Sequence, residues 1–288
     1  MRISKIQNLV AEAKIREAID MVLDYATASK DFELQNSLIL LKSRFARVKQ
    51  QENMGIVTYT DALREQAIIS HSLLELISKL NENTFKSSST INDEVENTRK
   101  TILFLGSNPN DTGKLQLEKE FVRISRSLQE GSIDFRLAAE WAITPNELQK
   151  AMLMHKPKIV HFSGHGTRGI KGGIVLQDSN GKAQVVTGKA LANLFSIVSK
   201  RFSIDVVLLN SCYSKEQAGS ISQYVKYVIG MNNSINDNAA IEFSTGFYRG
   251  LGSEDEVEFA FDLAKNMIML EGLSDEDIPE IYIDGELK

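Results

Sequence analysis

A cysteine and two histidines follow two apolar segments of this chain. His161 and His165 lie four residues apart in IVHFSGHG, residues 159–166, and Cys212 ends IDVVLLNSC, residues 204–212. A lone cysteine is most often a small buried hydrophobic residue. Next to a base, however, a thiol becomes a nucleophile near neutral pH, and histidine is the side chain that titrates in that range. The residue types therefore predict covalent catalysis by Cys212 and His165, provided that the fold brings them together.

Glycines flank one of the histidines closely. Gly164 and Gly166 stand on either side of His165. Glycine lets a substrate backbone approach and exposes amide N–H groups that stabilise an oxyanion. The N–H group of Cys212, expected at a strand-to-helix turn, is a second candidate donor.

The HxxxH spacing also raises the question of a metal site. On a helix this spacing places two imidazoles on one face, but here it falls at the end of a strand and no Glu lies between the histidines. We expect no metal and no cofactor. His161 alternates with Phe162, so we expect it to point to the opposite face of the strand and to bond a neighbour.

Strand and helix patterns alternate from residue 100 onward. A parallel sheet covered on both faces is the expected architecture. Strands are predicted at 101–109, 133–140, 158–166, 204–212 and 228–231, a hairpin at 172–186, and helices at 114–129, 144–155, 187–200, 216–227, 237–250 and 255–270. Thr144 and Glu147 form a capping box with Pro145 at the first helical position. Because reactive side chains gather beyond the carboxyl ends of parallel strands, we expect His165 and Cys212 on one rim.

The first 80 residues have a different pattern. Apolar residues recur at helical spacing in three stripes, with a break at 53–55 and with Thr60 as the expected N-cap of the third helix. Residues 81–99 have a linker composition, and an exposed linker with Lys86 and Arg99 is where proteolytic nicking is expected. We predict a small helical domain at 1–80, a linker at 81–99 and an α/β domain at 100–288.

Charge and hydropathy exclude several classes of function. The net charge is −5, so nucleic acid and anionic membrane are not expected partners. The sequence contains no run of about 20 apolar residues, so no membrane span is predicted. The N-terminal residues do not form a signal peptide. We therefore expect a cytoplasmic protein.

Residues 101–270 resemble the CHAT domain, a family of caspase-like cysteine peptidases. The matching segments are IVHFSGHG (159–166), VVLLNSCYS (206–214), VIGM (228–231), FSTGFYRGL (243–251) and VEFAFDLA (257–264). A histidine about 50 residues before the cysteine is also the caspase order. The resemblance implies that Cys212 is the nucleophile and His165 the catalytic acid and base. It also implies that the backbone amides of Gly166 and Cys212 form the oxyanion site.

The resemblance leaves the substrate-binding residues open. Asn210 precedes Cys212 by two residues, a position at which some relatives of the wider clan carry an acid that binds a basic P1 side chain. Asp237, after VIGM, is a second candidate for an acidic S1 pocket; otherwise it caps the following helix. His161 matches a family position too, with a structural role expected rather than a role in substrate binding.

The N-terminal segments LVAEAKIREAIDMVLDYA and LQNSLILLKSRFARV resemble an effector-associated domain, a helical module of bacterial conflict and defence proteins. The prediction is a cysteine endopeptidase that cleaves a specific protein in bacterial defence or cell-death signalling. Residues 1–80 would bind a protein partner and regulate the peptidase. The alternatives are a catalytically inactive caspase-like adaptor that mediates protein assembly, and a metal-dependent hydrolase. Fast alkylation of Cys212 by iodoacetamide distinguishes a catalytic thiol from the inert thiol of an adaptor.

Overall fold

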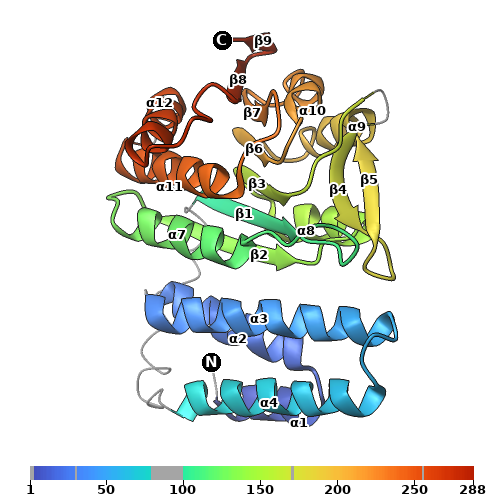
Figure 1. Ribbon diagram of the computed structural model, residues 1–288. Coiled ribbons are helices and arrows are strands. Elements are labelled where there is room, and N and C mark those ends of the chain that lie inside the picture. Colours follow the sequence, from blue (N-terminus) through green and yellow to red (C-terminus); the bar gives the residue numbers. More distant parts are fainter. Residues whose placement is uncertain (1–2, 30, 79–99, 170–171, 255) are drawn as a thin grey trace. The chain divides into compact units, whose positions relative to one another are not determined.

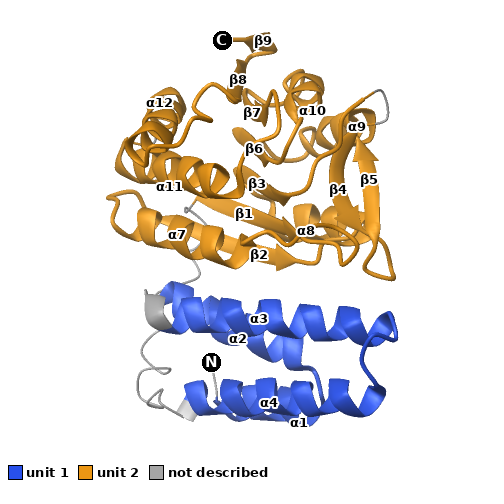
Figure 2. Cartoon of the chain, viewed as in Figure 1, with its two compact units in different colours: residues 1–99 blue, residues 100–288 orange. Residues whose placement is uncertain are grey.

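The chain divides into two compact units, residues Met1–Arg99 and Lys100–Lys288 (Figure 2). The computed structural model describes residues 3–29, 31–78, 100–169, 172–254 and 256–288. The expected linker at 81–99, with Lys86 and Arg99, lies outside the described residues. Each unit has its own set of buried apolar side chains.

The first unit consists of helices (Figure 1). They are α1 (Ile3–Ala11), α2 (Ile15–Ala28), α3 (Phe32–Asn53) and α4 (Tyr59–Ser78). The first apolar stripe is split between two helices, because Ala13 adopts a left-handed conformation with φ of 59°. The expected cap at Thr60 is wrong. The hydroxyl of Thr58 accepts a hydrogen bond from the Asp61 N–H at 3.1 Å, so α4 begins two residues earlier than expected.

A seven-stranded sheet forms the centre of the second unit. Its strands are β1 (Lys100–Ser107), β2 (Phe135–Trp141), β3 (Ile159–Gly164), β6 (Val206–Asn210), β7 (Tyr227–Met231), β8 (Pro279–Ile283) and β9 (Glu286–Leu287). Their order is β2-β1-β3-β6-β7-β8-β9. The five strands from β2 to β7 are parallel, whereas β8 and β9 pair antiparallel. The mostly parallel sheet that the sequence predicts is confirmed, and the two antiparallel strands are an addition that the sequence did not predict.

Helices cover both faces of this sheet. On one face α11 (Asp237–Glu254) packs against α7 (Leu117–Gln129) and α12 (Val257–Leu270). On the other face α9 (Gly188–Val198) packs against α8 (Pro145–His155) and α10 (Lys215–Ile221) (Figure 1). A hairpin of β4 (Gly173–Gln177) and β5 (Ala183–Thr187) lies beside α9. The predicted capping box of α8 is present, with Thr144 and Glu147 bonded to each other's backbone N–H groups.

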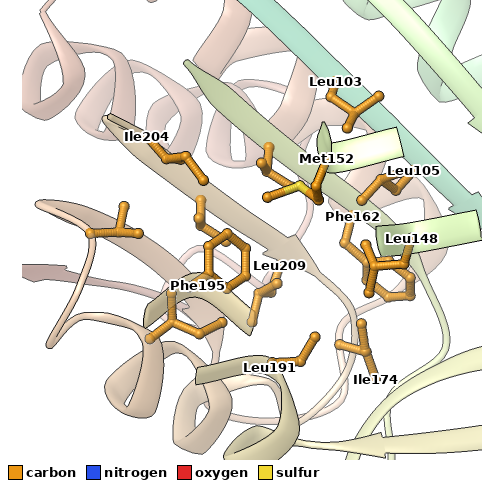
Figure 3. Close-up of a cluster of buried hydrophobic side chains, with 14 of the residues drawn as sticks. Leu103, Leu105, Leu148, Met152, Phe162, Ile174, Leu191, Phe195, Ile204 and Leu209 are labelled. Atoms are coloured by element: carbon orange, nitrogen blue, oxygen red, sulfur yellow. The ribbon is translucent and has the colours of Figure 1, made fainter. Parts of the chain in front are cut away.

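The pleat of the strands divides their side chains between two environments. Alternate residues face α8 and α9, where they form the apolar cluster drawn in Figure 3, which includes Leu103, Leu105, Phe162, Leu209, Leu148, Met152, Leu191 and Phe195. The intervening residues face α7 and α11. Phe104 and His161 stack there with ring centroids 5.1 Å apart, and both side chains are fully buried. The second face is therefore the one that admits polar groups.

Candidate active site

The two strands that lead to the chemically reactive residues are neighbours. β3 and β6 pair in parallel from Ile159 opposite Val206 to Ser163 opposite Asn210. His165 follows Ser163 by two residues and Cys212 follows Asn210 by two. Because parallel strands end at the same edge of a sheet, both residues lie at the carboxyl rim.

The backbone of Gly166 packs directly against Cys212. A Cβ added to Gly166 would lie 2.0 Å from the Cys212 carbonyl oxygen and 3.3 Å from its nitrogen. A side chain of any size is therefore excluded at this position. The structure brings the His165 segment and Cys212 together, as the sequence predicts.

Replacing Gly166 with alanine is expected to separate these two segments. The added methyl group meets backbone atoms, which cannot move aside as a flexible side chain does. We expect a loss of about 1–3 kcal/mol in the free energy of unfolding and a change in the rate at which iodoacetamide alkylates Cys212. Urea unfolding and alkylation kinetics measure these effects.

The matched control is Gly252→Ala. There the atom nearest to the added Cβ is a carbonyl oxygen at 3.5 Å, an ordinary contact. An alkylation rate for Gly166→Ala equal to that of the Gly252→Ala protein would contradict the close packing of Gly166 on Cys212.

The imidazole of His165 is oriented by a backbone carbonyl. Its Nε2 lies 2.7 Å from the carbonyl oxygen of Gly113. A carbonyl oxygen only accepts hydrogen bonds, so Nε2 must carry the proton. In the neutral imidazole the lone pair is then on Nδ1, which is the atom available to accept a proton.

The loop that carries the Gly113 carbonyl, residues 108–116, is held by the hairpin. The Asn110 N–H donates to the Gly181 carbonyl at 3.1 Å. The carboxylate of Asp111 accepts from the Ala183 N–H at 2.8 Å. These bonds fix the carbonyl that orients His165.

The thiol of Cys212 lies against the loop between β7 and α11. Its Sγ is 3.5 Å from the Ser234 hydroxyl and 3.8 Å from the Ile235 carbonyl oxygen, to which it donates. The side chain is half-buried. Tyr213 follows with φ of 57°, and its N–H donates to the Asn233 carbonyl at 3.1 Å. The left-handed residue turns the chain away from β6 at the cysteine.

The two backbone N–H groups expected to bind an oxyanion have no acceptor within the described part of the chain. Gly166 forms an isolated antiparallel bridge with Ile174. The hydrogen bonds of this bridge come from the residues on either side of Gly166, so its own N–H is not used. The N–H of Cys212 is likewise not a donor among the hydrogen bonds of the described residues. Neither N–H group is therefore committed to a hydrogen bond within the described residues.

His161 and Asn210 lie inside the protein instead of facing a substrate. Their exposed fractions are 0% and 3%. His161 Nε2 lies 3.0 Å from a carboxylate oxygen of Glu120 and Nδ1 lies 3.1 Å from the Tyr248 hydroxyl. Asn210 Nδ2 donates to the same oxygen of Glu120 at 2.6 Å. Asn210 is therefore too buried to meet a P1 side chain, which corrects that expectation, and the bonds of His161 to Glu120 and Tyr248 fit the structural role expected for it.

The correction for Asn210 has a simple cause. β6 ends at Asn210, and Ser211 and Cys212 lie in a turn. The rule that residues two apart share a face holds only within a strand. The asparagine and the thiol therefore point into different environments.

Glu120 is a site residue that the sequence analysis missed. Its side chain is buried, and its carboxylate accepts hydrogen bonds from His161, Ser163, Asn210 and Ser244. Burial alone raises the pKa of this carboxyl, but the bond to His161 and the hydroxyls of Ser163 and Ser244 outweigh it and leave the pKa below its ordinary value of 4.5. A signal was present in the sequence, because Glu120 falls on the apolar stripe of α7 between Leu117 and Ile124.

Asp237 lies close to the loop that contacts the thiol. It is the first residue of α11 and follows Ile235 by two residues. Its carboxylate accepts from the backbone N–H of Gln116 at 3.2 Å and from its side-chain Nε2 at 3.0 Å. The side chain is half-buried. A role in binding P1 stays a prediction.

The two histidines bond different partners, Glu120 and Tyr248 for His161 and Gly113 for His165. Over the ranges that the structure describes, no group of three or more His, Cys, Asp and Glu side chains is placed to hold a metal ion. None of the helices in those ranges combines the length and the apolar character needed to cross a membrane.

A parallel sheet with a histidine loop and a cysteine at the ends of adjacent central strands defines a caspase-like α/β protein. The sequence profile of the CHAT domain matches residues 62–271, and that of effector-associated domain 11 matches residues 1–81. The chain therefore belongs to the CHAT domain family. The CHAT profile starts inside α4, whereas the compact α/β unit starts at Lys100. All the site residues lie within that unit.

Two curated proteins are similar in sequence. A Roc-COR-CHAT protease from an unknown prokaryotic organism is 23% identical over 279 residues, which cover 92% of this chain and 26% of the relative. A probable protease of Gillisia limnaea is 28% identical over 174 residues, which cover 59% of this chain and 30% of the relative. The chain spans between a quarter and a third of the length of these relatives.

Among solved structures, a secreted C11 cysteine protease of Bacteroides thetaiotaomicron in complex with an irreversible peptide inhibitor matches with a TM-score of 0.44. The identity is 11%, and the match covers 65% of this chain and 66% of the other.

Proposed function

We propose that this protein is a cysteine endopeptidase in which Cys212 is the nucleophile and His165 the acid and base. The observation that carries the proposal is the contact between the Gly166 backbone and Cys212, which brings the imidazole segment to the thiol. Membership of the CHAT domain family and the protease names of the two curated relatives support it.

The proposed reaction begins with transfer of the thiol proton to Nδ1 of His165. The thiolate sulfur then forms a bond to the scissile carbonyl carbon, and the carbonyl electron pair moves to the oxygen. The N–H groups of Gly166 and Cys212 donate to this oxyanion. His165 returns the proton to the leaving amine as the C–N bond breaks. Water then attacks the thioester carbonyl carbon while His165 takes its proton. The C–S bond breaks as the carbonyl forms again, the acid leaves, and His165 returns the proton to the sulfur.

Hydrolysis of a peptide panel tests this function. Fluorogenic peptides with Arg, Lys, Asp, Leu or Ala at P1 are incubated with the full chain before and after treatment with iodoacetamide. Cleavage that disappears when Cys212 is alkylated supports the proposal. A Cys212 thiol that reacts no faster than a model thiol, together with no cleavage of any peptide or protein, favours the adaptor function.

We further propose that Asp237 binds a basic P1 side chain. Its place two residues after Ile235, whose carbonyl contacts the thiol, supports this role. A charge-assisted hydrogen bond contributes about 1.5–3 kcal/mol. Asp237→Asn is therefore expected to lower kcat/KM for Arg peptides by about 10- to 100-fold and to leave Leu peptides little changed.

Asp275→Asn is the matched control. The carboxylate of Asp275 accepts from the Asn236 N–H at 3.3 Å, so it holds the same loop from outside α11. If Asp237→Asn slows Arg and Leu peptides equally, Asp237 supports the loop instead of selecting P1. The same result from Asp275→Asn would strengthen that reading.

The first unit is proposed to bind a protein partner and to regulate the peptidase in bacterial defence or cell-death signalling. The match to effector-associated domain 11 supports this role. Leu63 and Leu74 of α4 are 46% and 37% exposed within the described residues and offer apolar surface to a partner. Comparing peptide cleavage by the full chain with cleavage by residues 100–288 measures the effect. Faster cleavage by residues 100–288 than by the full chain indicates that the first unit inhibits the peptidase. Equal cleavage rates indicate that the first unit serves recruitment only.

A further inference from the structure

The carboxylate of Glu120 contacts the ends of both β3 and β6, the strands that lead to His165 and Cys212. Ser163 and Asn210 form the last residue pair that joins β3 to β6. The Ser163 hydroxyl donates to one oxygen of Glu120, and Asn210 Nδ2 donates to the other at 2.6 Å. Glu120 therefore bridges the two strands at the point where their backbone ladder ends.

Beyond this pair the chain has no further ladder bonds between β3 and β6. His165 stands two residues past Ser163 and Cys212 two residues past Asn210. This pair is therefore the last backbone link between the two strands before the segments that carry the imidazole and the thiol. A small shift of Ser163 relative to Asn210 would therefore also move the His165 imidazole relative to the Cys212 thiol.

The same carboxylate is anchored on the helical side. It belongs to α7, and it accepts from the Ser244 hydroxyl of α11 at 2.6 Å. Asn210 Nδ2 also donates to the Ala240 carbonyl of α11 at 3.0 Å. Glu120 is 3% exposed. A buried ion is tolerated only when its hydrogen-bonding capacity is filled, and four side-chain donors fill it here.

We propose that Glu120 is a positioning residue for the Cys212–His165 pair. As a buried carboxylate it ties the last rung of β3 and β6 to α7 and α11, and so fixes the segments that carry the imidazole and the thiol. This inference rests on the proposed peptidase function, although the thiol itself reports on it independently.

Glu120→Gln tests the inference, with Glu242→Gln as the matched control. Glu242 is also a buried glutamate between α7 and α11, paired with Arg123, and no hydrogen bond or ion pair among the described residues joins it to β3 or β6. Glu120→Gln keeps the size of the side chain and removes its charge. Since a displacement of about 1 Å at reacting groups costs up to about 100-fold in rate, we expect kcat to fall about 10- to 100-fold with KM little changed. Glu242→Gln should retain the wild-type kcat.

The second readout is the pH dependence of Cys212 alkylation. In the Glu120→Gln protein the profile should move toward that of the His165→Gln protein, because the thiol loses its paired imidazole. In the Glu242→Gln protein the pH profile of Cys212 alkylation should equal that of the wild type. A folded Glu120→Gln protein with a wild-type kcat and alkylation profile overturns the inference.

A second pair of variants decides the matter if Glu120→Gln does not fold. Ser163→Ala and Ser244→Ala each remove one hydroxyl from the same carboxylate, the first from β3 and the second from α11. The inference requires that Ser163→Ala lower kcat and shift the alkylation profile more than Ser244→Ala does, at a similar loss in Tm. Equal effects overturn it. A wild-type protein that cleaves nothing and whose Cys212 thiol reacts no faster than a model thiol would reject the proposed function. A reactive thiol without cleavage would still let the alkylation profiles test the role of Glu120.

Discussion

Replacing Cys212 with alanine is expected to abolish peptide cleavage while leaving the protein folded. The sulfur is the single atom that forms a bond to the substrate in the proposed reaction, and loss of a nucleophile costs on the order of 10⁶-fold in kcat. The Cys212 side chain is half-buried, and among the described residues its sulfur forms hydrogen bonds to Ser234 and Ile235. We therefore expect a change in Tm of no more than a few degrees.

The measurement is the initial rate of the best peptide of the P1 panel, with circular dichroism melting for the fold. Wild-type protein fully alkylated at Cys212 is the companion sample, since this is the single cysteine of the chain. Both samples should fall to the rate of buffer alone. Residual cleavage by a pure, folded Cys212→Ala protein would assign the reaction to another group and reject the cysteine mechanism.

Replacing His165 with glutamine is expected to lower kcat by about 10²- to 10⁴-fold, the usual contribution of a general acid and base. The glutamine amide can take the place of Nε2 and keep a bond to the Gly113 carbonyl, so the loop at 108–116 stays in place. It offers no basic nitrogen in the position of Nδ1. The rate at which iodoacetamide alkylates Cys212 should fall toward that of a model thiol.

The matched control for this prediction is His155→Gln. His155 lies in the same unit, with Nε2 3.2 Å from the Glu140 carboxylate, but on α8 and apart from the residues of the rim. We expect its kcat and its alkylation profile to equal those of the wild type. If His165→Gln keeps the wild-type profile as well, Nδ1 is not the group that activates the thiol, and the proton acceptor must be sought elsewhere on the rim.

The features of the fold that depend on local chemistry could be predicted from the sequence. The capping box of Thr144 and Glu147 appears in the structure, because the two side chains satisfy backbone groups three residues apart. The alternation of strands and helices predicted the parallel sheet, because parallel neighbours are joined by helices that cover both faces of the sheet. The pairing of β7 with β8 could not be read in this way, because β8 is a five-residue strand whose partner lies about 50 positions earlier in the chain.

In the candidate site, too, the features that follow from local motifs could be predicted, and those that depend on distant contacts could not. His165 and Cys212 were found from motifs next to apolar runs, and both lie where parallel strands end. Asn210 was misplaced because the point at which β6 gives way to a turn depends on the left-handed residue at Tyr213 and on its bond to Asn233. Glu120 was overlooked because an acid within a helical pattern reads as a surface residue unless its place on the apolar stripe is weighed.

The order of the supporting contacts along the chain has a consequence for biosynthesis. His165 and Cys212 both leave the ribosome before α11, which supplies Ser244 to the Glu120 carboxylate and Tyr248 to His161. The thiol likewise meets Ser234 and Ile235 only afterwards. Because a polypeptide is made from its N-terminus, a nascent chain that ends near β7 carries both reactive side chains without the helix that completes their surroundings. The bonds that Ser244 and Tyr248 supply to the Glu120 and His161 cluster can therefore form only after α11 has been made.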